Sequence, residues 1–134
     1  MDGYSSVMKA MDLEFFGGGR HKIQPGAFLG QASALMLDVR SAEEVATLSF
    51  GLSYHLPVLH IPINEIPDRW SEIPKDKLVG VFCSSGTRSA MVYLYLQAHG
   101  LEQVRIIEGA YAEMADELKP GKLLKHLTTA RRDA

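Results

Sequence analysis

The hydrophobic residues of this chain gather in short runs that are separated by polar or helix-forming stretches. The clearest runs cover residues 35–39, 59–61, 78–82 and 104–107. Such nearly continuous apolar runs are typical of strands that are buried on both faces of a parallel sheet. The segment 21–23 predicts a further, short strand at the edge of the sheet.

Helical patterns fill the intervals between these runs. The predicted helices span residues 25–29, 41–49, 64–70, 87–99 and 111–118. Ser41 and Glu44 have the spacing of a capping box, and Asn64 is the predicted cap of the next helix. We expect Pro120 and Gly121 to stop the last helix. Since strands alternate with helices, the chain is predicted to be an α/β protein with a mainly parallel sheet and helices on both faces.

The two ends of the chain are less regular. Val7, Met8, Met11 and Phe15 have helical spacing, but the glycines at 17–19 predict a turn that ends any helix there. The segment 119–134 is rich in lysine and arginine, and a solvated helix face with a frayed end is the interpretation that the pattern favours.

Composition and charge set limits on the function. With 134 residues, of which 46% are apolar, the chain fits one domain with a core of its own. The net charge of -2 gives no sign of a nucleic-acid partner. Residues 1–9 lack the apolar stretch of a signal peptide, and no run reaches the length of a membrane span, so we expect no membrane partner and a cytoplasmic location. The single cysteine excludes an internal disulfide.

That cysteine, Cys83, lies on the turn between the predicted strand 78–82 and the predicted helix 87–99. The turn consists of small polar residues and carries a cation, Arg88. Backbone N–H groups, the helix N-terminus and the guanidinium would all lower the pKa of the thiol. A lone cysteine is usually a small buried hydrophobe, but a core cysteine needs neither a polar loop nor a cation. We therefore predict a nucleophile at Cys83 and an anion-binding role for Arg88.

Four motifs of the chain resemble those of a known family. They are Asp38-Val39-Arg40, His60-Ile61-Pro62, Cys83-Ser84-Ser85-Gly86-Thr87-Arg88-Ser89 and Glu108-Gly109-Ala110. In order and spacing, over residues 22–118, the chain resembles a single-domain rhodanese of the thiosulfate sulfurtransferase type. The resemblance implies the rhodanese-like three-layer sandwich. We expect an N-terminal extension at 1–20, a rhodanese-like domain at 21–120 and a basic C-terminal tail at 121–134.

The resemblance also implies a sulfurtransferase that uses a persulfide. Cys83 would be the nucleophile and the persulfide carrier, in a cradle formed by Ser84, Ser85, Gly86, Thr87 and Arg88. Asp38, Arg40 and Ser89 would support that loop. Gly86 would supply a positive φ or a close backbone approach. The implied partners are a small anionic sulfur donor such as thiosulfate and a thiol or cyanide acceptor, with no cofactor and no metal.

Three alternatives stay open. The protein could be a sulfur carrier or relay that takes sulfur from another protein and passes it on. It could be a phosphatase or arsenate reductase of related fold, although four residues separate Cys83 from Arg88 here and such enzymes place five between cysteine and arginine. The intact cysteine loop disfavours the third alternative, a non-catalytic binding module.

Overall fold

One five-stranded parallel sheet organises the protein. The computed structural model describes residues 2–132. The strands are β1 (Lys22–Ile23), β2 (Ala34–Asp38), β3 (Val58–His60), β4 (Leu78–Phe82) and β5 (Val104–Ile107). Their spatial order is β1-β5-β4-β2-β3, and every pairing is parallel. The strongest apolar runs of the sequence, β2 and β4, pair at the centre of the sheet.

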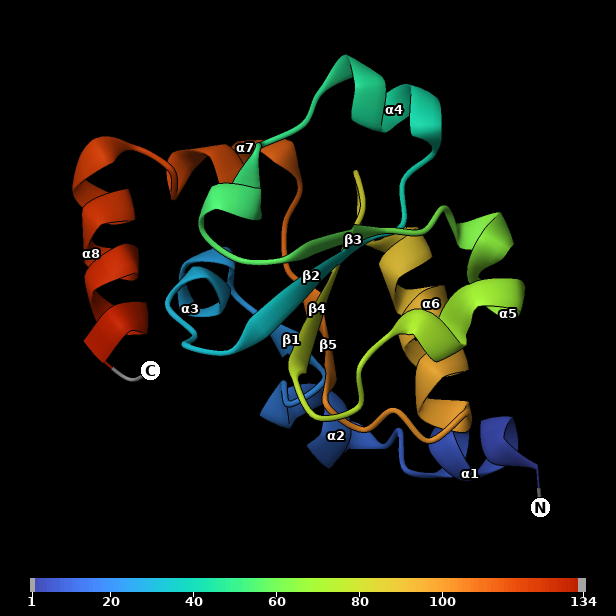
Figure 1. The fold of residues 1–134 in the computed structure, drawn as a ribbon. Coiled ribbons are helices and arrows are strands. Elements are labelled where there is room, and N and C mark those ends of the chain that lie inside the picture. The colour runs from blue at the N-terminus through green and yellow to red at the C-terminus, as the bar shows by residue number, and fades with distance from the viewer. Residues whose placement is uncertain (1, 133–134) are drawn as a thin grey trace.

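Helices cover both faces of this sheet. The helices are α1 (Gly3–Lys9), α2 (Leu13–Gly18), α3 (Pro25–Leu29), α4 (Ala42–Thr47), α5 (Ile66–Arg69), α6 (Thr87–Ala98), α7 (Tyr111–Asp116) and α8 (Pro120–Arg132), with 3₁₀ turns at Leu52–Tyr54, Ile63–Glu65 and Trp70–Glu72. Figure 1 shows α1, α5 and α6 on one side of the sheet and α3, α7 and α8 on the other. The predicted three-layer α/β sandwich is therefore confirmed.

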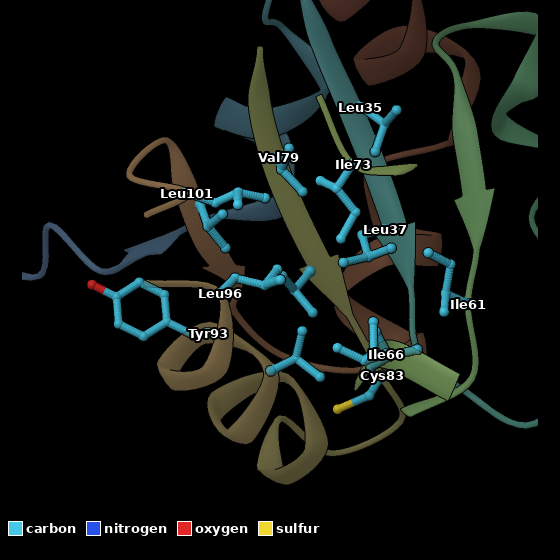
Figure 2. Close-up of a cluster of buried hydrophobic side chains, with 14 residues drawn as sticks. Leu35, Leu37, Ile61, Ile66, Ile73, Val79, Cys83, Tyr93, Leu96 and Leu101 are labelled. Atoms are coloured by element: carbon cyan, nitrogen blue, oxygen red, sulfur yellow. The ribbon is translucent and has the colours of Figure 1, made fainter. Parts of the chain in front are cut away.

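The core consists of two clusters, one on each face of the sheet. Leu37 and Val81 belong to the cluster under α6 (Figure 2), and Phe28 and Phe82 belong to the cluster under α3 and α7. Gly80 in β4 allows α3 to approach the sheet closely, because a Cβ there would lie only 2.5 Å from Cε1 of Phe28. This double burial places the carboxyl ends of the two central strands, rather than their faces, within reach of ligands.

Two local predictions are wrong. Asn64 does not cap a helix; it lies inside the 3₁₀ turn Ile63–Glu65, which runs directly into α5, and Pro67 fills one of the first two positions of that helix. Because a preceding turn and a proline leave fewer free N–H groups, a side-chain cap is not required there. The helix predicted at 111–118 ends before Pro120, as α7, but Pro120 and Gly121 do not stop it; they begin α8, since proline fits the first turn of a helix. Over residues 120–132, helix α8 confirms the helical interpretation of the segment 119–134.

The turn predicted at glycines 17–19 is confirmed only in part. Gly17 and Gly18 form the last turn of α2, and only Gly19, with φ of +66°, ends it. Of the residues with helical spacing, Val7 and Met8 lie in α1 and Phe15 lies in α2, whereas Met11 lies between the two helices. Among residues 2–132, none of the helices combines the length and the apolar composition that crossing a bilayer requires.

Candidate active site

The candidate site lies where the two central strands end. In the parallel pairing of β2 with β4, Asp38 is aligned with Phe82, so Cys83 follows at the same edge of the sheet. The chain then turns through residues 83–86 into α6. Helix α4, which follows β2, lies beyond this edge (Figure 1). The fold therefore brings the predicted Asp38–Arg40 and Cys83–Ser89 segments together.

Backbone geometry aims the loop at the sulfur of Cys83. The amide of Gly86 donates a hydrogen bond to Sγ over 3.0 Å. Gly86 has φ of +90°, which confirms the expected left-handed conformation, and it precedes the first residue of α6. This conformation turns the chain sharply enough for the loop amides and the N-terminal end of α6 to face one atom. Cys83 itself is buried, and Figure 2 shows its side chain at the end of the core cluster.

Ser89 supplies a buried hydroxyl near the sulfur. Its side chain is fully buried, and among the described residues Oγ has no hydrogen-bond partner of good geometry. The hydroxyl is nevertheless close enough to Cys83 to lower the pKa of the thiol. A buried hydroxyl without a partner is costly, so the negative sulfur of a thiolate is the acceptor that would satisfy it.

The environment favours the thiolate form of Cys83. Burial opposes ionisation, but the nearby Ser89 hydroxyl and the amides of Ser85 and Gly86 outweigh it and hold the pKa below the ordinary value of a cysteine. A thiolate is the nucleophilic form of cysteine. The fixed N–H groups also suit a second sulfur atom that carries the charge of a persulfide, because such dipoles need not reorganise during a reaction.

Arg88 is held by a partner that sequence reasoning missed. Nη1 donates to Oε1 of Glu44 over 2.6 Å and Nη2 donates to Oε2 over 2.9 Å, while Nη2 also donates to Oγ of Ser84 over 2.8 Å. The two arginine hydrogen bonds, followed by one from the Ser41 amide, lower the pKa of Glu44 to about 2. The capping box of α4, which the structure confirms, places this carboxylate. The sequence showed Glu44 only in its capping role.

Asp38 and Arg40 form a second ion pair, and it is fully buried. Nη2 of Arg40 lies 2.7 Å from Oδ2 of Asp38, and Nε donates to Oδ1 over 3.0 Å. The guanidinium also donates to the carbonyl of Leu48 and to the hydroxyl of Tyr111. Although burial opposes the charged form, the hydrogen bonds to Asp38 and Tyr111 raise the pKa of Arg40 further above its ordinary range. Arg40 thus ties the segment after α4 and the start of α7 to the end of β2.

The remaining predicted residues have minor contacts. The side chain of Thr87 is exposed at the first position of α6, and Ser85 is exposed as well. His60 lies at the end of β3, where Nε2 donates to the carbonyl of Arg40 over 2.7 Å, and Nε2 of His55 lies 2.6 Å from the carbonyl of Leu29. Within residues 2–132 no three histidine, cysteine, aspartate or glutamate side chains form a cluster that could hold a metal ion.

Known proteins share this architecture. Residues 27–117 match the profile of the family described as "Rhodanese-like domain". A protein from Allochromatium vinosum named "Sulfurtransferase" is 38% identical over 76 residues, a match that spans 56% of this chain and 65%, or just under two thirds, of that protein.

Solved structures of rhodanese-related proteins have a similar fold. A rhodanese-related protein from Thermoplasma volcanium superposes with a TM-score of 0.64 and 27% identity, over 75% of this chain and 95% of that one. The NAD-dependent persulfide reductase from A. fulgidus has a TM-score of 0.56 and 33% identity, over 81% of this chain but only 18% of that protein. Because the family profile covers well over half of the sequence, the chain belongs to the family of rhodanese-like domains.

Proposed function

We propose that this protein is a sulfurtransferase that moves a sulfane sulfur from thiosulfate or a similar donor to a thiophilic acceptor through a persulfide on Cys83. The observation that carries the proposal is the cradle around the sulfur, in which the Gly86 amide lies 3.0 Å from Sγ and the loop lowers the pKa of the thiol. The family membership and the sulfurtransferase names of relatives support sulfur transfer in general.

The chemistry has two balanced steps. In the first, the Cys83 thiolate attacks the sulfane sulfur of the donor, the S–S bond of the donor breaks, and sulfite leaves with the bonding electrons. A persulfide anion remains on Cys83 and accepts the loop hydrogen bonds. In the second step, an acceptor such as cyanide or a thiolate attacks the outer sulfur, and the Cys83 thiolate returns. No net oxidation takes place over the cycle, and no cofactor is required.

The other residues would act through this loop. The amides of Ser85, Gly86 and Ser89 would hold the negative sulfur, and Ser84 would position Arg88 through the contact between its Oγ and Nη2. Asp38 and Arg40 would support the ends of the strands without exchanging protons, because their ion pair is buried and closed.

A protein-to-protein sulfur relay is the second candidate. It would use the same Cys83 persulfide but would take the sulfur from a persulfide on another protein. The phosphatase alternative fits less well, because the short loop between Cys83 and Arg88 encloses a ring suited to one sulfur atom, whereas a phosphoryl group carries three oxygens that each need a donor.

Intact-mass spectrometry tests the proposed function directly. After incubation with thiosulfate, the protein should gain the mass of one sulfur atom, and cyanide should remove it with release of thiocyanate. Because Cys83 is the only cysteine, no internal disulfide can resolve the adduct. Cys83→Ser should neither gain sulfur nor form thiocyanate while its circular dichroism stays unchanged. Substantial turnover by this variant, or phosphatase activity in place of sulfur transfer, would refute the assignment.

A further inference from the structure

Arg88, the residue expected to bind an anionic donor, already forms an ion pair with Glu44. Both terminal nitrogens of Arg88 donate to the carboxylate of Glu44, at 2.6 and 2.9 Å, in a two-point contact. Such paired contacts between guanidinium and carboxylate are among the stronger polar contacts in proteins. A donor that needs Arg88 must therefore displace Glu44 or bind beside its negative charge.

The second cation near the loop is occupied as well. Arg40 is closed against Asp38 and is buried. The two guanidinium groups at this edge of the sheet thus face two carboxylates, and their formal charges cancel. What remains for a negative sulfur is the field of the loop amides and of the N-terminal end of α6. That field is local, and it suits a single charged atom at the position of Sγ.

Donors of sulfane sulfur differ in the charge that they bring to this site. Thiosulfate is a dianion, and its sulfonate oxygens must lie next to the sulfur that Cys83 attacks. An organic persulfide, R–S–SH, brings a neutral or singly charged sulfur that is bonded to carbon and not to a sulfonate. The cost of placing negative charge near Glu44 is therefore largest for thiosulfate.

We propose that Glu44 is a specificity-determining residue that occupies Arg88 and so directs Cys83 toward organic persulfides and away from thiosulfate. The inference rests on the proposed function and names the donor class for the same site. With a persulfide donor, the Cys83 thiolate attacks the outer sulfur of R–S–SH and the S–S bond breaks. The products are the thiolate R–S⁻, which takes the bonding electrons, and Cys83–S–SH.

Glu44→Gln is the variant that isolates the charge. Glutamine keeps an oxygen to accept from the Ser41 amide and from Arg88, so the capping box is retained. The matched control is Glu43→Gln on the same helix, because Glu43 is exposed and its carboxylate has no ion pair among the described residues. Both variants should remain folded, with a somewhat lower melting temperature for Glu44→Gln, which loses the ion pair with Arg88, and an unchanged one for Glu43→Gln.

The alkylation of Cys83 gives a readout that needs no sulfur transfer. Iodoacetate is an anion and iodoacetamide is neutral, so the ratio of their rates reports the charge near the thiolate. Glu44→Gln should raise the iodoacetate-to-iodoacetamide ratio about fivefold or more, and Glu43→Gln should leave it within about twofold, since exposed charges further away are screened. A ratio that is unchanged in Glu44→Gln would overturn the inference.

Turnover with two kinds of donor completes the test. Glu44→Gln should raise kcat/KM for thiosulfate about tenfold, mainly through a lower KM, because the negative charge that faces Arg88 is removed and the guanidinium can attract the dianion. With cysteine hydropersulfide, kcat/KM should change by less than about twofold. A persulfide carried by another protein forms a further arm, which distinguishes protein donors from small ones. An equal change with all donors, or a loss with all donors, would show that Glu44 positions the loop instead and would overturn the inference.

The two proposals fail in different ways. If no donor of either kind loads sulfur onto Cys83 in the wild type or in Glu44→Gln, the proposed function fails. If thiosulfate and persulfides both load the wild type, and Glu44→Gln does not change their relative efficiency, the function stands and the role of Glu44 fails.

Discussion

Arg40 and Asp38 form an ion pair at the end of β2 in which Nη2 and Oδ2 lie 2.7 Å apart and both side chains are almost completely buried. Arg40 is the largest of the fully buried side chains of the described residues. Its guanidinium also lies 5.3 Å from the ring centre of Phe82 and 5.4 Å from that of Tyr111. A charge in such a place is tolerated only because each of its donors faces an acceptor or an aromatic ring.

We expect Arg40→Met to destabilise the protein by about 3–5 kcal/mol, because Asp38 would remain as a buried and unpaired charge. Urea unfolding curves measure the change. The control is Arg69→Met, which breaks the exposed ion pairs with Glu65 and Glu72 and should cost about 1 kcal/mol or less. The double variant Asp38→Asn/Arg40→Met should recover part of the loss. Equal effects of Arg40→Met and Arg69→Met would show that the buried pair is not a main support of the fold.

Much of the fold could be predicted from the sequence because burial on both faces of a sheet leaves a local pattern. The runs at residues 78–82 and 104–107 match β4 and β5 to the residue. The position of Cys83 between a strand and a helix followed from the same pattern. In contrast, the role of Pro120 was predicted wrongly, because a proline after a helix fits the end of that helix and the first turn of the next one equally well.

The electrostatic arrangement of the site could not be predicted in the same way. Glu44 and Arg88 lie 44 residues apart, and nothing in the spacing of either segment indicates that α4 is placed over the cysteine loop. Their contact depends on the path that the chain takes after β2. Tertiary contacts, such as the hydrogen bond from Arg40 to the carbonyl of Leu48, define that path. A local pattern identifies the nucleophile, but the charge that surrounds it is a property of the whole fold.

Ser89→Ala should raise the pKa of Cys83. The hydroxyl of Ser89 is the largest of the contributions that oppose the effect of burial on this thiol. Since a lowered pKa keeps the thiolate populated at lower pH, its loss should move the midpoint of the alkylation profile upward. A hydrogen bond to a charged group contributes about 1.5–3 kcal/mol, so sulfur transfer near neutral pH should fall about tenfold or more.

Ser85→Ala is the matched control for this prediction. Ser85 is exposed and affects the sulfur through its backbone amide, which alanine retains. Its alkylation profile should coincide with that of the wild type. If Ser89→Ala titrates like the wild type as well, the buried hydroxyl does not interact with the thiolate.

Stability should depend on pH through Glu44. The pKa of Glu44 is lowered from 4.5 to about 2 in the folded protein, first by Arg88 and then by the Ser41 amide. A lowered pKa stabilises the fold above the unfolded-state value, and this contribution is lost as the pH falls from about 4.5 to about 2. Urea midpoints of the wild type and Glu44→Gln should therefore differ most at neutral pH and converge below that window. A difference that stays constant down to pH 2 would contradict the role of the ionised carboxylate.

Gly86→Ala tests whether the loop depends on the left-handed backbone conformation of residue 86, because the added methyl group causes no steric clash. An added Cβ would meet no atom within 4 Å, but φ of +90° is a conformation that alanine disfavours. We expect a loss of stability of about 1–2 kcal/mol. Sulfur transfer should fall by more than tenfold, because relief of the strain moves the amide that lies 3.0 Å from Sγ. Thiocyanate formation and urea unfolding measure the two effects.

Two further substitutions make this test specific. Gly86→Asn should lose less stability than Gly86→Ala, since asparagine tolerates the left-handed region better than other residues that carry a Cβ. Gly121→Ala in α8 also places its Cβ in open space, but there the backbone is helical. It should therefore leave activity unchanged and stabilise the protein by about 1 kcal/mol or less. If Gly86→Ala keeps full activity, the loop does not depend on this conformation, and the cradle proposed for the persulfide would have to be formed by other amides.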